Sequence, residues 1–483
     1  MLAALILLVL LVTPAAAAAQ APPTAQTPPP PPKTRETPGQ APGAEFDLRT
    51  PPSPTIPSAP QILFPVQVPP PEAGRPTQTF EFHPLLGFSE EYSDNFNRSV
   101  SNHRDNFRTM VSPGMNVLLD SAFLSGSATY TISGFYDSFV DDFGYFNTFS
   151  GQLSWQAARY LKLLAAAGLN QSDQPEQADS LGLQVNRRRF TTANALVGAE
   201  WNIDPVTLKP YYRVSFFNQE EGPETLTNQL GGIGSLSIAQ IHTLTLGYEY
   251  VVSDTSAVSG PKTQSHIVGN QFTGSFSRDL SIRTTAGISG SYAFRTQDLR
   301  LPDADTDFTL WSGSVFVNYA VTNTVLLRAN VGVSQLSNER TDRDPIVTTN
   351  SSLSYWFGHA VATIGVDRGY AETFLGGENQ GVVLTTGGRA SLTYYFSPLL
   401  NLTGNVGYRE NEFTGIGGIA TPVAGNRSPT RTDKVLNGGL RLSYQIVRWL
   451  GAGLEYYYSR TDSSDVRGDV VENRVKLSLN GTF

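Results

Sequence analysis

The stretch Val435-Leu-Asn-Gly-Gly-Leu-Arg-Leu-Ser-Tyr444 alternates between two kinds of side chain along its length. In an extended chain, one face carries Leu436, Gly438, Leu440, Leu442, Tyr444 and Ile446, and the other carries Asn437, Gly439, Arg441, Ser443 and Gln445. A strand with one apolar and one polar face separates an apolar medium from a polar one. The stretch therefore predicts a membrane strand between lipid and a polar interior.

The same unit recurs roughly every 40 residues, which is enough for two membrane-crossing strands and two connections. Tight turns that mark the repeat lie near Asp120, Ala157, Asp204, Ala239, Asp279, Thr322, Gly358, Pro398 and Arg448. Longer polar stretches, such as Gln171 to Arg187 and Gly415 to Thr432, lie between them. Nine turns leave ten outward hairpins, so we expect about 20 strands, with 18 as the alternative, in one closed antiparallel barrel over residues 80–483. The first hairpin, Phe80 to Leu118, has the weakest pattern.

A β-propeller also repeats at about 40 residues, but it divides each repeat into four short strands. Here each repeat contains two alternating runs of about 12 residues, the length of a tilted membrane strand. The pattern favours an all-β transmembrane up-and-down barrel over a propeller. Short turns on one side and long loops on the other are typical of outer-membrane barrels, whose short turns face the periplasm.

The first 19 residues resemble a secretory signal peptide. Leu2 to Val12 is too short to span a bilayer as a helix but suits a signal-peptide core, and Ala15 to Ala19 supplies small residues for cleavage. Because no Lys or Arg precedes this core, a start codon upstream of Met1 is one expectation. A second is that the amino terminus alone supplies the positive charge. The mature chain is expected to have no helical membrane anchor.

Residues 20–79 are rich in proline and include the run Pro28 to Pro32. Such a segment lacks the apolar residues needed for a core, so we expect an extended, disordered segment in the periplasm. A spacer is the simpler interpretation, and docking to peptidoglycan or to another partner is the alternative.

This segment is predicted to be dispensable for barrel folding, because it has no periodic apolar face. Deletion of Thr24 to Thr77, with the signal retained, should leave a membrane-inserted barrel whose electrophoretic mobility changes on heating. Loss of insertion in that deletion variant would contradict the prediction.

Composition excludes several classes of function. Charged residues make up 16% of the chain, less than in most soluble domains, and the net charge of −8 does not favour nucleic-acid binding. There is no cysteine, and the histidines (His83, His103, His242, His266 and His359) lack metal-ligand spacing. No serine occupies a nucleophile elbow on a strand-to-helix turn. We therefore expect no cofactor and no enzymatic activity, although a catalytic set on the barrel rim remains the minor alternative.

The chain ends on an alternating strand with a terminal aromatic residue. Val475, Leu477, Leu479 and Phe483 share one face, and Lys476, Ser478 and Asn480 share the other. This pattern resembles the C-terminal signal that the outer-membrane barrel-assembly machinery reads. Gly481 departs from it, because the signal prefers an apolar side chain there.

Cations recur on the polar face of the expected strands. With the aliphatic face outward, the basic belt of the lumen comprises Lys162, Arg213, Arg283, Arg328, Arg389 and Arg441. A charge that faces lipid near the midplane costs about 2–4 kcal/mol, which favours the inward assignment. Two interpretations stay open: the cations pair with acids such as Glu200 and Glu455, or they attract anionic cargo.

The opening of the expected barrel resembles a known family. The segment Glu90-Glu-Tyr-Ser-Asp-Asn95, followed by Phe107-Arg-Thr-Met-Val-Ser-Pro-Gly114, is similar to the opening of the beta-barrel porins of type two. That family consists of outer-membrane proteins often associated with exopolysaccharide or capsule systems. The resemblance implies a porin-like barrel in a Gram-negative outer membrane and polysaccharide export components as partners. It implies no catalytic or ligand residues.

Two function classes follow from these patterns. The first is a channel for passage or export of polysaccharide or other anionic solutes, since a barrel of about 20 strands can enclose an aqueous lumen. The second is a non-conducting barrel that serves as a scaffold or surface-binding module. Acidic residues in the expected outer loops include Asp141, Asp142 and Glu220. A solvated surface is the simpler interpretation of these residues, and divalent-cation bridging to lipopolysaccharide is the alternative.

Overall fold

The computed structural model describes residues 80–121, 123–139, 141–174, 187–220, 222, 224–256, 264–299, 307–338, 343–373, 381–414, 431–464 and 469–483. The predicted signal peptide and proline-rich segment lie outside these residues. The strands are β1 (Glu81–Ser93), β2 (Asn106–Asp120), β3 (Leu124–Asp137), β4 (Asp142–Ala158), β5 (Leu161–Ser172), β6 (Phe190–Ile203), β7 (Val206–Gln219), β8 (Glu224–Ile238), β9 (His242–Ser256), β10 (Gln264–Ser281), β11 (Thr284–Leu299), β12 (Phe308–Thr322), β13 (Val325–Asn338), β14 (Ile346–Phe357), β15 (Ala360–Glu372), β16 (Val382–Ser397), β17 (Leu400–Phe413), β18 (Thr432–Val447), β19 (Leu450–Ser463) and β20 (Val470–Thr482).

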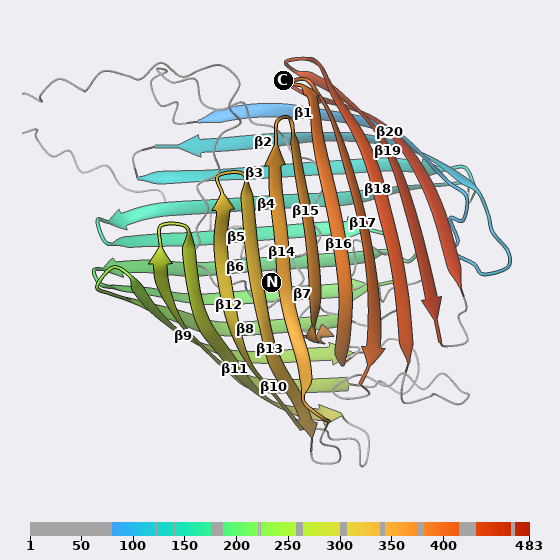
Figure 1. The fold of residues 1–483 in the computed structure, drawn as a ribbon. Helices are drawn as coiled ribbons and strands as arrows, with labels where there is room; N and C mark the ends of the chain where they lie inside the picture. The colour runs from blue at the N-terminus through green and yellow to red at the C-terminus, as the bar shows by residue number, and fades with distance from the viewer. Residues whose placement is uncertain are drawn as a thin grey trace, which may run out of the picture. The chain divides into compact units, whose positions relative to one another are not determined.

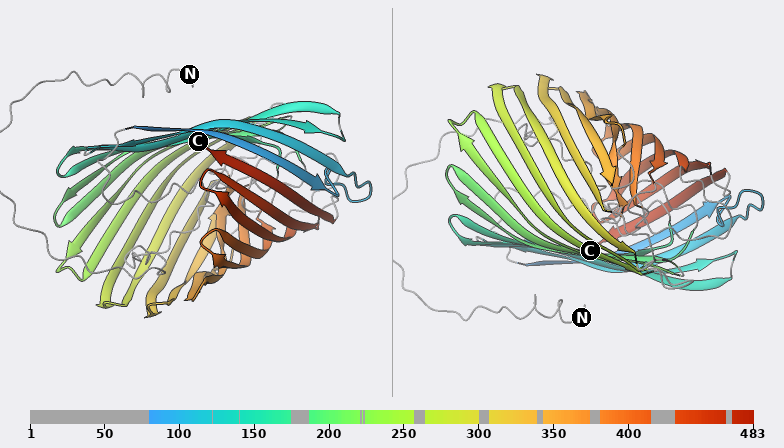
Figure 2. Two further views of the ribbon diagram at one scale, coloured as in Figure 1. Left: turned by 90° about the horizontal axis from the view of Figure 1, so that it is seen from above. Right: turned by 90° about the horizontal axis from the view of Figure 1, so that it is seen from below.

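The twenty strands form one closed antiparallel barrel. Each strand pairs with its neighbours in sequence, as β1 does with β2 and β19 does with β20, and β1 also pairs with β20. In Figure 1 the strands of the near and far walls cross steeply, as in a barrel of tilted strands. In Figure 2 the red C-terminal strands lie beside the blue N-terminal ones. Closure leaves no strand edge unpaired, which a wall in contact with lipid requires. The prediction of about 20 strands in an all-β barrel is confirmed, including the weakly patterned first hairpin.

The two faces of the wall follow the alternation of the sequence. In β18, Leu440, Leu442 and Tyr444 are exposed on the outer surface, while Asn437 and Arg441 alternate with them toward the interior. The outer faces of other strands carry exposed apolar side chains in the same way, for example Leu246 and Ile288. Within the described residues, no helix is long and apolar enough to cross a membrane.

Short turns join alternate strands at one end of the barrel. Gly358 and His359 alone separate β14 from β15, and Gly358 adopts a φ of +55°. That backbone conformation suits glycine, because a side chain would be strained there. All nine predicted turns lie at this end, which we call the turn end. The opposite, loop end carries the remaining hairpin connections.

Aromatic side chains on the outer surface donate hydrogen bonds to amide side chains of neighbouring strands, and the four tyrosines among them lie near the middle of their strands. The pairs are Tyr130 with Asn147 (2.8 Å), Tyr212 with Asn228 (2.7 Å), Tyr248 with Asn270 (2.7 Å), Tyr456 with Asn473 (2.7 Å) and Trp311 with Gln335 (3.1 Å). A Tyr or Trp in an apolar setting needs a partner for its polar group. These pairs therefore satisfy the polar groups of the aromatic side chains on the outer wall.

The last strand places the residues of the predicted assembly signal on the outer surface. Val475, Leu477, Leu479 and Phe483 are all exposed there. The Phe483 ring stacks on Trp449, with 5.4 Å between ring centroids. A Cβ atom at position 481 would lie 3.1 Å from the Phe483 ring, so Gly481 lets the terminal ring fold back over the strand. The departure at Gly481 thus has a packing reason.

Candidate functional site

The barrel interior divides into two levels. Inward-facing polar side chains near the loop end are buried, among them Glu91, Thr225, Gln297, Thr461 and Glu472. Nearer the turn end, inward-facing side chains such as Asn405 and Ser391 are exposed. The loop half of the lumen is therefore packed, and the turn half is open to solvent.

Arg108 is the centre of the packed level on one wall. Its guanidinium donates to both carboxylate oxygens of Asp137, at 2.7 Å each, and to both of Asp173, at 2.9 and 2.7 Å. The guanidinium also lies 4.5 Å from the centroid of the Phe135 ring. Because Asp173 directly follows β5, this contact spans β3 and β4 and links the end of β5 to β2.

Burial alone raises the pKa of Asp173, but the charge and hydrogen bonds of Arg108 and the charge of Arg187 outweigh it. The pKa of Asp173 is therefore held below its usual value of 3.8. This carboxylate remains ionised well into the acid range, so the contact with Arg108 persists at neutral pH.

Glu472 is the second centre of the packed level, and its side chain is completely buried. It accepts hydrogen bonds from Arg187 (2.6 Å), Arg98 (3.1 Å) and the Ser93 hydroxyl (2.8 Å). Nε of Arg474 lies 3.8 Å from the same carboxylate. These partners come from the connections before β2 and β6 and from β1 and β20. Glu472 thus joins the closing strands to segments that fold inward over them.

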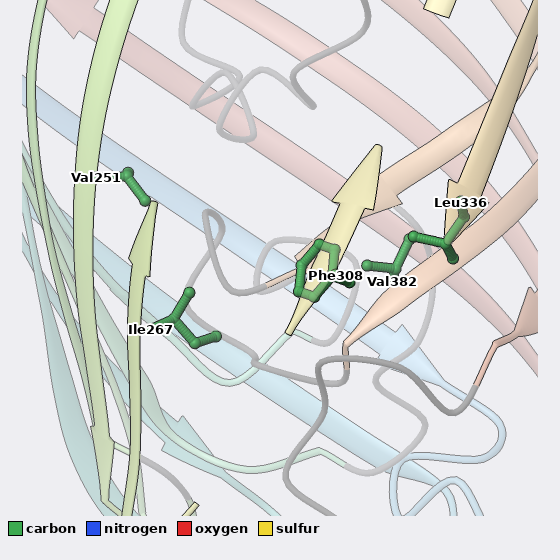
Figure 3. Close-up of a cluster of buried hydrophobic side chains, with 5 residues drawn as sticks. All are labelled: Val251, Ile267, Phe308, Leu336 and Val382. Carbon is green, nitrogen blue, oxygen red and sulfur yellow. The ribbon is translucent and has the colours of Figure 1, made fainter. Parts of the chain in front are cut away.

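Similar contacts skip strands on the opposite wall. Buried Arg295 on β11 pairs with Glu372 on β15 at 3.1 Å, and Arg343, before β14, pairs with Glu412 on β17 at 3.3 Å. A buried apolar cluster lies at the same end of the strands and contains Val251, Ile267, Phe308, Leu336 and Val382. Phe308 and Val382 lie side by side in Figure 3, with Leu336 next to Val382. Contacts between strands that are not neighbours narrow the lumen at the loop end.

The open level contains five of the six cations predicted for the basic belt. Arg213, Arg328, Arg389 and Arg441 alternate with exposed apolar residues of their strands and so lie on the inner face. Lys162 lies there too, because its neighbour Leu161 stands opposite Trp201, which is exposed on the outer face. Arg283 does not: it lies exposed in the two-residue turn between β10 and β11. The prediction for Arg283 was wrong because β10 continues to Ser281, which leaves positions 282 and 283 for the turn.

The cations also differ in depth, so they do not form a belt at one level. Lys162 lies one residue inside the turn end of β5, whereas Arg213 and Arg389 lie near the middle of their strands. Sequence spacing placed the cations on one face, but their heights depend on where each strand begins.

The acids predicted as partners have different surroundings. Glu200 forms an ion pair with Lys209 at 3.3 Å and stands opposite Lys162 in the strand register. Glu455 stands between Arg441 and Lys476 in the register. Within the described part of the chain, no carboxylate lies within 4 Å of the guanidinium of Arg213, Arg328, Arg389 or Arg441. Lys209 was not predicted, although it shares the inner face of β7 with Arg213.

The sequence did not predict the buried ionic contacts of the loop end. Arg108 lies within the quoted opening segment, but its acidic partners lie on β3 and after β5, so no local spacing identifies them. The same holds for Glu472, whose partners Arg98 and Arg187 lie hundreds of positions away in the chain. Among the residues that the structure describes, no group of three or more His, Cys, Asp or Glu side chains could hold a metal ion.

No protein-family model matches the chain, and no curated protein matches its sequence. The resemblance to the type two beta-barrel porins therefore stays a prediction.

Several solved outer-membrane proteins of Pseudomonas aeruginosa are similar in structure. A variant of the ferric enterobactin receptor PfeA has 12% identity and a TM-score of 0.49, over 83% of this chain and 80% of that one. The siderophore receptor PirA has 14% identity and a TM-score of 0.45, over 85% and 81%. OccK2 (OpdF) has 11% identity and a TM-score of 0.41, over 84% and 100%. The strand register of this chain itself establishes the closed barrel.

Proposed function

We propose that this chain is an outer-membrane channel that passes anionic solutes through its lumen. The observation that carries the proposal is the set of four inward arginines, Arg213, Arg328, Arg389 and Arg441, which have no ion-pair partner among the described residues. A low-dielectric wall focuses the field of such charges across the lumen, which raises the local concentration of anions.

The exposed apolar outer face supports a location in a bilayer. A closed barrel of this kind belongs in the outer membrane of a Gram-negative bacterium, with its short turns and the proline-rich segment on the periplasmic side. The proposed partners are outer-membrane lipid, lipopolysaccharide and the barrel-assembly machinery, which would read Val475, Leu477, Leu479 and Phe483. Polysaccharide is the cargo implied by the family resemblance, with export components as partners. No enzymatic activity is proposed.

Replacing the four arginines with glutamine should shift the reversal potential in a salt gradient toward cation selectivity. The shift should grow at low ionic strength, because salt screens charges beyond a Debye length of about 10 Å at 0.1 M. Planar-bilayer recordings measure it. Arg283→Gln is the matched control, because its side chain lies in the exposed turn, and it should leave selectivity nearly unchanged. Unaltered selectivity in a folded, conducting quadruple variant would refute anion attraction.

The packed loop half of the lumen favours a second candidate, a non-conducting barrel used as a scaffold. Contacts such as Arg295 with Glu372 link strands that are not neighbours and narrow the path for solutes. Conductance of the wild-type barrel distinguishes the two candidates, since a scaffold should show no channel steps in a planar bilayer.

A further inference from the structure

One stretch of the open wall, on β16, β17 and β18, combines free cations with free amides. Arg389, Asn405, Asn437 and Arg441 all face the lumen there. Arg389 stands opposite Gly407 in the register, and Gly407 stands opposite Asn437. Asn405 stands opposite Gly439, and Arg441 lies two residues further toward the turn end. Asn405 therefore lies between the positions of Arg389 and Arg441 on the wall, and Asn437 lies at the height of Arg389 on the strand that carries Arg441.

Two glycines give this stretch its shape. A Cβ atom at Gly407 would lie 2.7 Å from Oδ1 of Asn437, and one at Gly439 would lie 2.7 Å from Oδ1 of Asn405. Each asparagine side chain thus lies flat over the glycine of the next strand. Any side chain at 407 or 439 would push the amide away from the wall. The result is a shallow polar floor beside Arg389 and Arg441, formed by Asn405 and Asn437, which we call the amide floor.

The donors of this stretch are available to a solute. Within the described residues, no hydrogen bond or ion pair occupies the guanidinium of Arg389 or Arg441 or the side-chain amide of Asn405 or Asn437. Arg389 and Asn405 are exposed to the lumen. The side chain of Arg389 also extends toward Gly365 on β15, where a Cβ atom would lie 3.3 Å from its Nε. Donors without partners in a water-filled lumen are free to bind an anion.

The acids of this wall are already balanced by other cations. Asp367 lies 3.7 Å from Arg409, and the pair meets across Gly387 on the intervening strand. Glu455 stands between Arg441 and Lys476. Lys476 also stands opposite Glu91. With Arg389 included, four cations (Arg389, Arg409, Arg441 and Lys476) face three carboxylates (Asp367, Glu455 and Glu91), which leaves an excess of positive charge.

The other inward arginines lack this setting. Arg213 lies beside Tyr211, whose hydroxyl donates to Glu249 at 2.6 Å, and Glu249 also accepts from Gln229 at 3.2 Å. Arg328 stands opposite Asn318 on β12 and Ser352 on β14, and neither of these two strands contains an arginine. Arg213 and Arg328 are therefore matched controls with the same charge and the same orientation toward the lumen.

We propose that Arg389, Asn405, Asn437 and Arg441 form a binding site for solutes that carry at least two oxyanion groups, carboxylate or phosphate. Each guanidinium binds one group with paired N–H donors, and the amide floor donates hydrogen bonds to the segment between them. This proposal rests on the proposed anion channel. It adds that one wall of the lumen determines which anions the channel prefers.

The test uses current block in planar bilayers in potassium chloride. Tripolyphosphate and citrate should reduce the chloride current of the wild-type barrel at low concentration, whereas acetate should not. The double variant Arg389→Gln, Arg441→Gln should raise the half-blocking concentration roughly tenfold, since it removes charge-assisted hydrogen bonds at two positions. The control variant Arg213→Gln, Arg328→Gln should change it far less. Block by tripolyphosphate but not by citrate identifies phosphate as the ligand chemistry. Block by citrate but not by tripolyphosphate identifies carboxylate.

Equal loss of block in both double variants would overturn the proposed site, because a diffuse field would then explain the block, while the anion channel would stand. Titration calorimetry of the detergent-solubilised barrel with tripolyphosphate tests the site without conduction. Binding that is lost in Arg389→Gln, Arg441→Gln and kept in the control pair supports the site even if the barrel does not conduct. Absence of binding to the wild-type barrel would overturn it. Heat-dependent electrophoretic mobility confirms that each variant is folded.

Discussion

Replacement of Glu472 with glutamine is expected to lower the free energy of unfolding of the barrel by about 3–5 kcal/mol, the cost of leaving a buried charge without its partner. Glu472 is completely buried and is within ion-pair distance of Arg98, Arg187 and Arg474. Glutamine retains an oxygen acceptor but removes the negative charge. The three guanidinium groups would then repel one another in a region that water does not reach.

Unfolding of the purified barrel in urea, in lipid vesicles or detergent, measures this effect. Glu455→Gln is the matched control, because Glu455 lies on the next strand in the half of the lumen open to water, where an ion pair contributes at most about 1 kcal/mol. Equal stability of the two variants would mean that the carboxylate of Glu472 is not needed to hold the inward-folded segments.

Acid should weaken the same level of the barrel through Asp173. Because the folded state lowers the pKa of Asp173, its contribution to stability is complete above the usual value of 3.8 and is lost as the pH falls through the lowered pKa. This group therefore predicts no change in stability between pH 5 and pH 8. The free energy of unfolding, measured from pH 5 to pH 8, checks this expectation. A decline of stability near neutral pH would require another titrating group.

Substitution of Leu440 by arginine is expected to destabilise the barrel by about 2–4 kcal/mol, the cost of a cation on the lipid face at the midplane. Leu440 is 48% exposed on the outer face of β18, between Leu436 toward the loop end and Tyr444 toward the turn end. In detergent or lipid, that exposed surface contacts hydrocarbon. The arginine side chain would have to bend along the wall so that its guanidinium leaves the hydrocarbon and reaches the membrane boundary.

The matched control is Ser443→Arg on the same strand. Ser443 faces the lumen in the half that is open to solvent, where a longer side chain can extend into water. This variant should insert and unfold like the wild type in vesicles. If Leu440→Arg is tolerated as well as Ser443→Arg, the assignment of the two faces of β18 would be reversed.

Much of the fold could be predicted from the sequence because the strand period is local. Alternation in Val435 to Tyr444 assigned each side chain to lipid or lumen, and the structure retains that assignment for Leu440 and Arg441. Turn residues such as Gly358 marked the strand ends, because they favour conformations that a strand does not adopt. Strand number and inward cations follow from these two local signals.

Strand register and contacts between distant segments could not be predicted in this way. The position of each cation along the barrel axis depends on the exact residues at which its strand begins and ends. This is why Arg283 lies in a turn and why Lys162 lies much closer to the turn end than Arg389 does.

The sequence alone thus determined a closed barrel with an apolar outer face and a partly basic inner face, because side-chain alternation requires only neighbouring residues. Only the tertiary structure decided that Arg108 meets Asp173, that Glu472 joins Arg98 and Arg187, and that the loop half of the lumen is packed. It also decided that Asn405 and Asn437 lie flat beside Arg389 and Arg441, since the glycines that permit this belong to the neighbouring strands. Such contacts form only when closure of the barrel brings residues far apart in the chain to one side of the lumen.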